Sequence, residues 1–490
     1  MMAASSALSR SFFDNALVMM GGTALAQAIP ILFAPVLTRI YSPEQYGVLA
    51  TFIGVAAVMT VVATLRLEPA VVLPENDAVA ANIAAVALLV ATVVSALVLV
   101  VALAGKEFIA RQWPAVGNGA WLLLVGPMVL LLALTQTASF WANRTRRFSV
   151  IAGGTVLQQG GTALLSLFAG LSGGAQLGLV AGRFGGQCLS AVWLVSRVFS
   201  EWRHVFGKVS WSGMKAAVSS YRQFPKFNLP YSLVGTVSRE LLVFALTLFH
   251  FTQQAGFYGL ARSVLYSPVS FLSSSLSQVF YKEAADSIGT PAFEALVARL
   301  LGGIILVFTP AFVALVFWGP ELFAFAFGAE WREAGVYAAI FAPAAWLFLF
   351  SSWPERIFEV AGRQQLSLAI QLVSDILSVT VVLALLWQEA SPRVVLAAYT
   401  AIACGYHCAF VTAAFNVARL PASILWGAIA RSAVMIVAAA SAFAACRQVG
   451  PRQGLVVAIV LTALYSGAAL AWITWRRRTR IRSGRQEHVQ

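Results

Sequence analysis

Stretches of about 20 apolar residues recur along the whole chain, and they constrain its fold more than any other feature. A helix of that length spans the hydrocarbon core of a bilayer, and in lipid only helices and closed barrels satisfy every backbone hydrogen bond. The apolar stretches are continuous and lack the alternation of a barrel strand. With 60% hydrophobic and 11% charged residues over 490 positions, the sequence predicts an all-α polytopic membrane protein.

Fourteen of these stretches are predicted to form transmembrane helices. No connecting segment is long enough to hold a globular soluble domain. The predicted helices cover residues 13–38, 46–73, 79–104, 118–141, 148–171, 175–199, 224–250, 254–282, 295–318, 333–356, 365–387, 394–417, 423–446 and 452–475.

A short sequence pattern occurs twice in the same register, as transporters built from two related halves often show. It predicts two pseudo-symmetric six-helix lobes around a central cavity, residues 1–200 and 223–418. A cytoplasmic linker, 201–222, joins them, and two extra helices in 419–475 precede a basic cytoplasmic tail, 476–490. The repeated residues are Asn15 with Gly22-Thr23 and Tyr46-Gly47-Val48-Leu49-Ala50 in the first copy, and Asn228 with Gly235-Thr236 and Tyr258-Gly259-Leu260-Ala261 in the second.

The basic residues predict the orientation in the membrane. The net charge is +14, and about 23 of the 33 Lys and Arg residues fall on the side of the N-terminus, since cytoplasmic loops carry the excess of positive charge. Both termini are therefore expected in the cytoplasm. The basic tail is expected to lie against anionic membrane lipids. A nucleic-acid partner is not expected, because the basic residues occupy short loops and a tail rather than one folded domain.

Sequence motifs for catalysis and for nucleotide binding are missing from the chain. We find no GxxxxGK[ST] loop, no HExxH and no GxSxG. The four cysteines fall in or at the ends of apolar segments, and no histidine or carboxylate completes a metal-ligand set around them. We therefore expect a protein that is not an enzyme and holds no cofactor, with any transport driven by a Na⁺, H⁺ or substrate gradient.

Four arginines belong to the leading helices of the two predicted halves: Arg39, Arg66, Arg239 and Arg262. A guanidinium group stays charged when dehydrated and holds phosphate oxygens through two parallel hydrogen bonds. Arginines facing a central cleft would therefore bind an anionic headgroup. Structural alternatives remain open, because Arg39 could reach the membrane surface, Arg66 could pair with Glu68, and Arg239 could pair with Glu240.

Asp375 is the candidate for coupling to a cation. It lies within an apolar helix near Ser374, Ser378 and Thr380, and a carboxylate with hydroxyl neighbours can hold a sodium ion or a proton. Glu240 is a second candidate. A structural hydrogen bond or an ion pair would explain either carboxylate equally well.

The segments RSFFDNALVMMGGTALAQAIPILFAPVLTRIYSPEQYGVLATF and TLRLEPAVVLPENDAVAANI resemble the N-terminal half of bacterial Wzx-type oligosaccharide flippases. These flippases belong to the multidrug/oligosaccharidyl-lipid/polysaccharide exporter superfamily. The resemblance implies two six-helix lobes around a cationic cavity, with Arg239 and Arg262 as the residues that fit this trait best. It also implies transfer of undecaprenyl-diphosphate-linked oligosaccharide units across the bacterial inner membrane, for O-antigen, capsule or exopolysaccharide synthesis.

Three other functions stay open from the sequence. Lipid II flippases of the same superfamily have fourteen helices, whereas many Wzx-type proteins have twelve. A cation-coupled drug exporter would carry more acidic than basic cavity residues, which is the reverse of this chain. A membrane polymerase or ligase would carry a large external loop, which this chain lacks. A polysaccharide polymerase and a chain-length regulator are the protein partners that a flippase would be expected to have.

Overall fold

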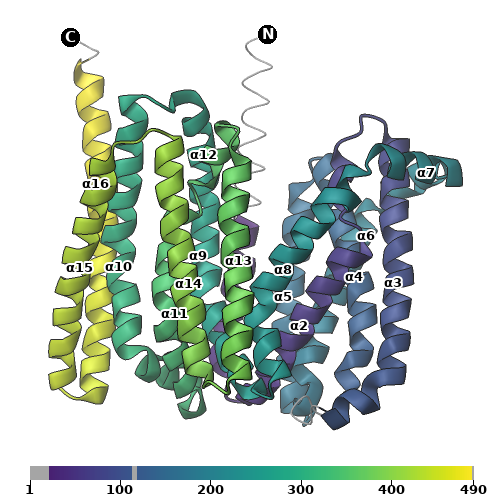
Figure 1. Ribbon diagram of the computed structural model, residues 1–490, viewed down its shortest axis with the longest axis horizontal. Coiled ribbons are helices and arrows are strands. Elements are labelled where there is room, and N and C mark those ends of the chain that lie inside the picture. Colours follow the sequence, from purple (N-terminus) through teal and green to yellow (C-terminus); the bar gives the residue numbers. More distant parts are fainter. Residues whose placement is uncertain (1–20, 113–118, 488–490) are drawn as a thin grey trace. The chain divides into compact units, whose positions relative to one another are not determined.

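The computed structural model describes residues 21–112 and 119–487. All regular secondary structure in these residues is helical. The chain packs as two compact units, Met1–Leu260 and Ala261–Gln490, and helix α9 (Thr252–Ser287) runs from the first into the second (Figure 1). The predicted lobe boundaries at 1–200 and 223–418 stay a prediction.

Thirteen of the fourteen predicted membrane segments overlap a long helix, and the segment 13–38, of which residues 13–20 lie outside the described residues, overlaps a shorter one. Among the described residues, 11 helices are long and apolar enough to cross a membrane, and the apolar helix Gly21–Leu37 is shorter. Two further long helices, α5 and α9, are less apolar because Gly, Ser and Gln interrupt them. The predicted all-α, multi-pass membrane fold is thus confirmed.

The described part of the first unit runs from the helix Gly21–Leu37 to the start of α9. A short helix, α7, lies within the segment that the sequence predicts as a polar linker, and the serine at its N-cap accepts a hydrogen bond from the Gly213 backbone N–H, which favours a helix start. The remaining helices are α2 (Pro43–Ala63), α3 (Asp77–Gln112), α4 (Val125–Arg144), α5 (Phe148–Leu171), α6 (Ala175–Phe206), α7 (Trp211–Ser220) and α8 (Leu229–Leu248), with short 3₁₀ or π turns at Glu68–Val72, Ala120–Leu124 and Phe224–Asn228.

Helix α2 corrects one sequence prediction. A single helix was expected over 46–73, but α2 ends at Ala63 and a separate 3₁₀ turn covers Glu68–Val72. Leu65 and Arg66 adopt left-handed backbone conformations, with φ of 51° and 54°. Pro69, inside the 3₁₀ turn, prevents a single helix over 46–73, because proline cannot donate the backbone hydrogen bond that a continuing helix needs.

Small side chains allow α5 and α6 to pack closely along their length. A Cβ at Gly182 would lie 2.1 Å from the Ser166 hydroxyl, and one at Gly186 would lie 2.3 Å from the Thr162 hydroxyl. In a bilayer, apolar burial gives helices no reason to associate, since lipid tails are as apolar as leucine. Close backbone approach at glycines supplies van der Waals contact instead, and it fixes the position of α6 in the unit.

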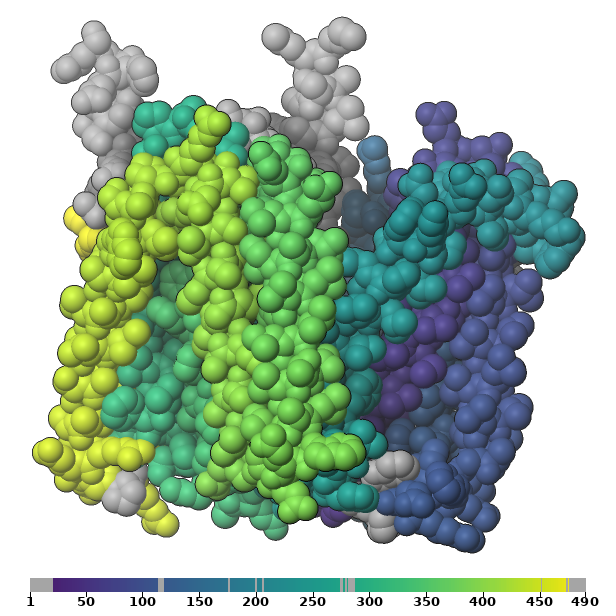
Figure 2. All heavy atoms as spheres, viewed as in Figure 1, coloured from purple at the N-terminus to yellow at the C-terminus, as the bar shows by residue number. Residues whose placement is uncertain are grey.

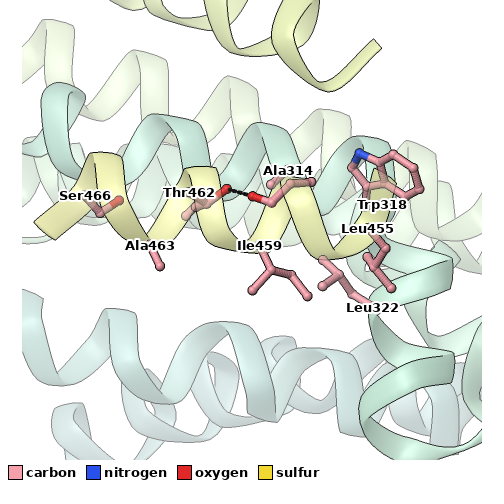
Figure 3. Close-up of a pocket in the computed structure, with 10 residues that line it drawn as sticks. Ala314, Trp318, Leu322, Leu455, Ile459, Thr462, Ala463 and Ser466 are labelled. Carbon is pink, nitrogen blue, oxygen red and sulfur yellow. Dashed lines mark hydrogen bonds between the residues drawn. The ribbon is translucent and has the colours of Figure 1, made fainter. Parts of the chain in front are cut away.

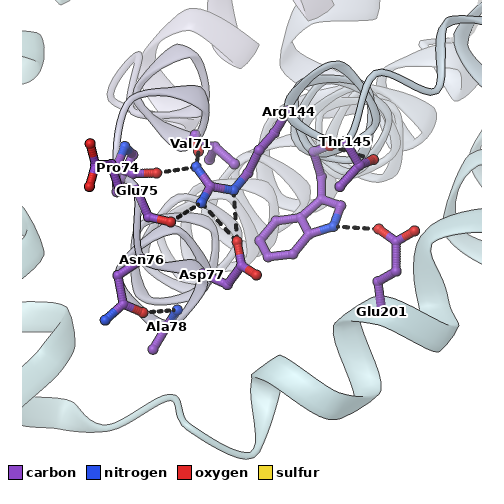
Figure 4. Close-up of polar contacts among 10 residues, drawn as sticks. Val71, Pro74, Glu75, Asn76, Asp77, Ala78, Arg144, Thr145 and Glu201 are labelled. Carbon is purple, nitrogen blue, oxygen red and sulfur yellow. Dashed lines mark hydrogen bonds and ion pairs between the residues drawn. The ribbon is translucent and has the colours of Figure 1, made fainter. Parts of the chain in front are cut away.

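One end of the first unit is held by the side chain of Arg144, the last residue of α4 (Figure 4). Its guanidinium donates to both Asp77 Oδ1, at 2.8 and 3.0 Å, and the Glu75 carbonyl, at 2.9 Å. It also donates to the Val71 carbonyl at 3.4 Å and to the Pro74 carbonyl. The side chain is only 11% exposed. Arg144 therefore ties the segment before α3 to the end of α4.

We expect Arg144→Gln to lower the stability of the first unit by about 2 to 3 kcal/mol, because charged hydrogen bonds to otherwise unpaired carbonyls are lost together. The apparent melting temperature, followed by tryptophan fluorescence in detergent, measures this. Arg146→Gln is the matched control, since Arg146 is exposed and lies two residues further on. Equal melting temperatures for the two variants would contradict the role of Arg144.

The described part of the second unit contains the rest of α9, seven further α-helices and a 3₁₀ turn at Ala329–Trp331. On the side of the second unit that faces the viewer in Figure 2, helices α13, α14 and α15 lie at the surface. A buried aromatic cluster around Phe280, Phe293 and Trp353 forms its main core. The helices are α10 (Pro291–Phe327), α11 (Arg332–Ser351), α12 (Glu355–Val360), α13 (Gln364–Trp387), α14 (Pro392–Val417), α15 (Ala422–Gln448) and α16 (Pro451–Glu487).

Candidate functional site

Arg66 and Glu68 form an ion pair in the turn after α2, past the end of the helix in which the sequence places them. Arg66 Nη1 lies 3.2 Å from Glu68 Oε1. The Glu68 side chain is fully buried, while that of Arg66 is 30% exposed. Glu68 Oε2 and Arg66 Nε are buried with no hydrogen-bond partner. The pairing expected as the structural alternative for Arg66 is thus present, and part of the guanidinium still reaches the surface of the unit.

Burial raises the pKa of the Glu68 carboxyl above its usual range, and a backbone hydrogen bond at Glu68, followed by the charge of Arg66, only partly offsets this effect. The folded protein therefore binds a proton more tightly at Glu68 than the unfolded chain does. The free energy of unfolding is therefore expected to fall as the pH rises. The fall begins near the pKa of a glutamate in the unfolded chain, about 4.3, and continues through the raised pKa of Glu68 in the folded protein. Glu68→Gln should remove this decline. Melting temperatures of wild type and variant across that pH range measure it, and parallel curves would contradict it.

Arg39 and Arg239 are exposed on the first unit. Arg39 follows the helix Gly21–Leu37, and its guanidinium donates to the Pro35 carbonyl of that helix. Arg239 lies in the middle of α8 and donates from Nη2 to the Thr236 hydroxyl at 3.0 Å. The neighbouring Glu240 is part-buried and turns toward α2, where its Cβ is 3.5 Å from the Cβ position of Gly54.

Two of the leading helices of the sequence repeats, α2 and α8, pack against each other within the first unit. The Thr51 and Thr247 hydroxyls share a buried hydrogen bond of 2.9 Å across this contact. At the start of α9 the backbones touch directly: a Cβ at Gly256 would be 1.8 Å from the Pro43 carbonyl oxygen. This crossing fixes α8, and therefore Arg239, relative to α2.

Arg262 lies two residues inside the second unit, on α9, and is part-buried. One helical turn later Tyr266 stacks on Phe341 and also contacts Phe348, both of α11, at ring-centroid distances of 5.3 Å. Residues four apart share a helix face, so Arg262 lies on the side of α9 that this aromatic contact orients.

Asp375 lies in the middle of α13 and is part-buried. Ser378, one turn later on the same face, is buried. Thr380 is exposed and donates to the Ile376 carbonyl of its own helix at 2.8 Å, so it does not share the surroundings of Asp375. In the described residues, no group of three or more His, Cys, Asp or Glu side chains could hold a metal ion.

A chain of buried polar side chains crosses the first unit and was not singled out from the sequence. Gln187 of α6 donates from Nε2 to the Thr135 hydroxyl of α4 at 2.8 Å and accepts a hydrogen bond from Gln158 of α5. Arg183, one turn before Gln187, has a buried Nε with no hydrogen-bond partner. Polar residues inside membrane helices cost free energy unless they are paired. Gln158 and Gln187, within apolar segments, were therefore the sequence signal from which these buried hydrogen bonds could have been expected.

A second buried polar pair lies in the second unit. The Ser351 hydroxyl at the end of α11 is 2.8 Å from His407 Nδ1 of α14, and both residues are buried. Phe348 and Tyr406 contact the imidazole ring edge to face. A lone histidine in an apolar helix gave no pattern from which this pairing could be predicted.

A groove of about 270 Å³ lies between α10 and α16 in the second unit (Figure 3). Trp318, Leu322, Leu455 and Ile459 give it an apolar surface. Its hydroxyl groups are satisfied internally, because Thr462 donates to the Ala458 carbonyl at 2.7 Å and Ser466 donates to the Val307 carbonyl at 3.0 Å. The groove is therefore suited to a hydrocarbon chain.

The fold is that of transporters of the MOP superfamily. The structure aligns with lipid II flippase MurJ in an inward closed conformation, at a TM-score of 0.68 and 12% identity over 95% of this chain and 100% of that one. It aligns with an inward-facing MATE family multidrug resistance transporter at a TM-score of 0.62 and 11% identity, over 82% of this chain and 94% of that one. With a MOP superfamily transporter from Pyrococcus furiosus the TM-score is 0.50 and the identity 12%, over 86% of this chain and 96% of that one. No curated protein matches the chain.

A family model of polysaccharide biosynthesis proteins matches residues 36–336, more than half of the chain. The chain therefore belongs to the polysaccharide biosynthesis protein family, and the resemblance seen in the sequence is confirmed. The matched region contains the four candidate arginines, whereas Asp375 lies outside it.

Proposed function

We propose that this protein is a flippase that moves undecaprenyl-diphosphate-linked oligosaccharide units across the bacterial inner membrane by alternating access. The observation that carries the proposal is a set of arginines in or at the ends of the leading helices of a polysaccharide biosynthesis family protein with a MOP-superfamily fold. A hydrated sugar diphosphate cannot cross an apolar layer of about 30 Å unaided. Binding sites for its charge along the path lower that barrier.

In this proposal Arg39, Arg66, Arg239 and Arg262 bind the diphosphate, because each guanidinium offers paired donors to phosphate oxygens. Arg66 is held by Glu68 and Arg239 by Thr236, so their side chains are oriented before the substrate arrives. The polyprenyl chain stays in apolar surroundings, and the groove between α10 and α16 offers it a mostly apolar surface on which the Thr462 and Ser466 hydroxyls are already hydrogen-bonded.

The remaining parts of the proposal concern energy, partners and placement. Asp375 and Glu240 are the candidates for coupling transport to Na⁺ or H⁺, since both carboxylates lie within long helices. Both termini lie in the cytoplasm, and a polysaccharide polymerase with its chain-length regulator receives the transported unit outside.

Lipid II is a second candidate substrate. The structural alignment with the lipid II flippase covers 95% of this chain. Both substrates present a diphosphate on a polyprenyl chain, so the sugar part distinguishes them.

Affinity for the shared part of these substrates tests the proposal. The full-length protein is titrated with undecaprenyl diphosphate, undecaprenyl monophosphate and undecaprenol, and binding is followed by native mass spectrometry. We expect the diphosphate to bind at least about tenfold more tightly than the monophosphate, a difference of about 1.4 kcal/mol. Equal affinity for the uncharged alcohol would contradict a site built on arginines.

A further inference from the structure

Two arginines on neighbouring helices of the second unit lie apart from the residues considered above. Arg299 belongs to α10 and Arg431 to α15, and these helices pack against each other. A Cβ at Gly302 of α10 would lie 3.3 Å from Arg431 Nη1. The guanidinium of Arg431 therefore lies over α10 where glycine leaves room, one turn from Arg299 on the same helix face. We refer to Arg299, Gly302 and Arg431 as the arginine patch.

Both guanidinium groups of the patch have donors to spare. Arg299 donates from Nε to the Ala295 carbonyl at 3.1 Å, and Arg431 donates from Nε to the Gly427 carbonyl at 2.9 Å. Both side chains therefore lean toward the N-terminal end of their helices. No acidic side chain of the described residues forms an ion pair with either arginine, and both are exposed. Their Nη groups can bind an external anion.

The position of the patch along the helices indicates the boundary between lipid and water. Arg299 directly precedes 19 residues without a charge, 300–318, which is enough to span the hydrocarbon core. Trp426 lies just before Arg431 on α15 and is 67% exposed, as expected for an interfacial tryptophan. Ile429 and Val434, on either side of Arg431, are exposed apolar residues of a lipid-facing surface. An arginine here reaches the headgroups with its long side chain.

The patch offers two separate sets of phosphate donors. The hydrogen bonds to the Ala295 and Gly427 carbonyls use the Nε donor of each arginine and leave the Nη donors of both. Each guanidinium can therefore hold one phosphate through its remaining donors. A headgroup with two linked phosphates can supply acceptors to both arginines at once, whereas a headgroup with one phosphate supplies half as many.

We propose that the arginine patch binds the headgroup of an anionic phospholipid that carries two phosphates. Arg299 holds one phosphate and Arg431 holds the other, and Gly302 and Gly427 leave room for the Arg431 guanidinium beside the helices. With the predicted topology, this lipid belongs to the cytoplasmic leaflet. The site is independent of the transported substrate.

Native mass spectrometry of the full-length protein tests the site. The protein is titrated with diphosphatidylglycerol, phosphatidylglycerol and phosphatidylethanolamine. We expect the wild type to retain diphosphatidylglycerol at concentrations where the other two are lost. The double variant Arg299→Gln/Arg431→Gln should need about tenfold more of this lipid for the same occupancy. Gly302→Leu, which keeps both charges but fills the space beside Arg431, should also weaken retention.

The matched control is Arg332→Gln/Arg393→Gln, which removes the same charge from exposed arginines that pair with Glu321 and Glu333. This control should retain diphosphatidylglycerol like the wild type. Unchanged retention in both patch variants would overturn the proposal. Equal retention of phosphatidylglycerol by the wild type would overturn the assignment to two phosphates.

Discussion

Replacing Gly256 by alanine is expected to destabilise the protein by more than about 3 kcal/mol, at the upper end of overpacking effects. The added Cβ would lie 1.8 Å from the Pro43 carbonyl oxygen and 2.8 Å from the backbone nitrogen of Gly47. Both contacts are with backbone atoms of α2, which cannot move aside as a flexible side chain could. Gly47→Ala meets the same obstacle from the other helix, at 1.9 Å from the Thr252 carbonyl oxygen.

The apparent melting temperature and the yield of monodisperse protein in detergent measure this effect. Gly467→Ala is the control, because it lies in the long helix α16 with nothing within 4 Å of its Cβ position. That variant should be neutral or slightly stabilising, since alanine favours helix over glycine by about 1 kcal/mol. If Gly256→Ala melted like Gly467→Ala, the close crossing of α2 and α9 would be wrong.

Arg262→Ala is expected to abolish export of the polysaccharide while the protein still inserts into the membrane at wild-type levels. The physical reason is that a buried phosphate contact from a guanidinium cannot be replaced by water once the site closes around the substrate. Arg262→Lys should restore only part of the activity, since an ammonium group keeps the charge but not the paired donors. Surface polysaccharide and the amount of protein in the membrane are measured in the same cells.

The control for Arg262→Ala is Arg332→Ala, which removes an exposed arginine paired with Glu321. Export in this control should match that of the wild type. Normal surface polysaccharide in cells that carry Arg262→Ala would rule out the role assigned to Arg262, because the loss of a phosphate ligand in the transport path cannot be silent.

The sequence predicted where helices occur better than where they end. Continuous apolar stretches predict membrane helices because the length needed to span the bilayer is fixed. The end of α2 was misplaced by ten residues, from Ala63 to 73, since hydropathy does not register the left-handed residues Leu65 and Arg66. Pro69 was the available signal for that turn.

Side-chain partners were less predictable than helices. The pairing of Arg66 with Glu68 followed from their proximity in the sequence, and the structure confirms it. The role of Arg144 could not be predicted, because most of its acceptors are backbone carbonyls, which every residue has. The rotation of α6, which brings Gln187 between Gln158 and Thr135, depends on tertiary packing at glycines far apart in the sequence.

The leaflet in which lipid-linked sugars accumulate tests the central claim most directly. In a strain that lacks this protein, undecaprenyl-linked intermediates are extracted after an impermeant reagent has been applied to each face of the inner membrane. The proposed flippase predicts that finished oligosaccharide-lipid accumulates only on the cytoplasmic face, and its mass identifies the sugar. Normal outward movement, with unpolymerised units accumulating on the outer face, would contradict the account and indicate a polymerase or ligase.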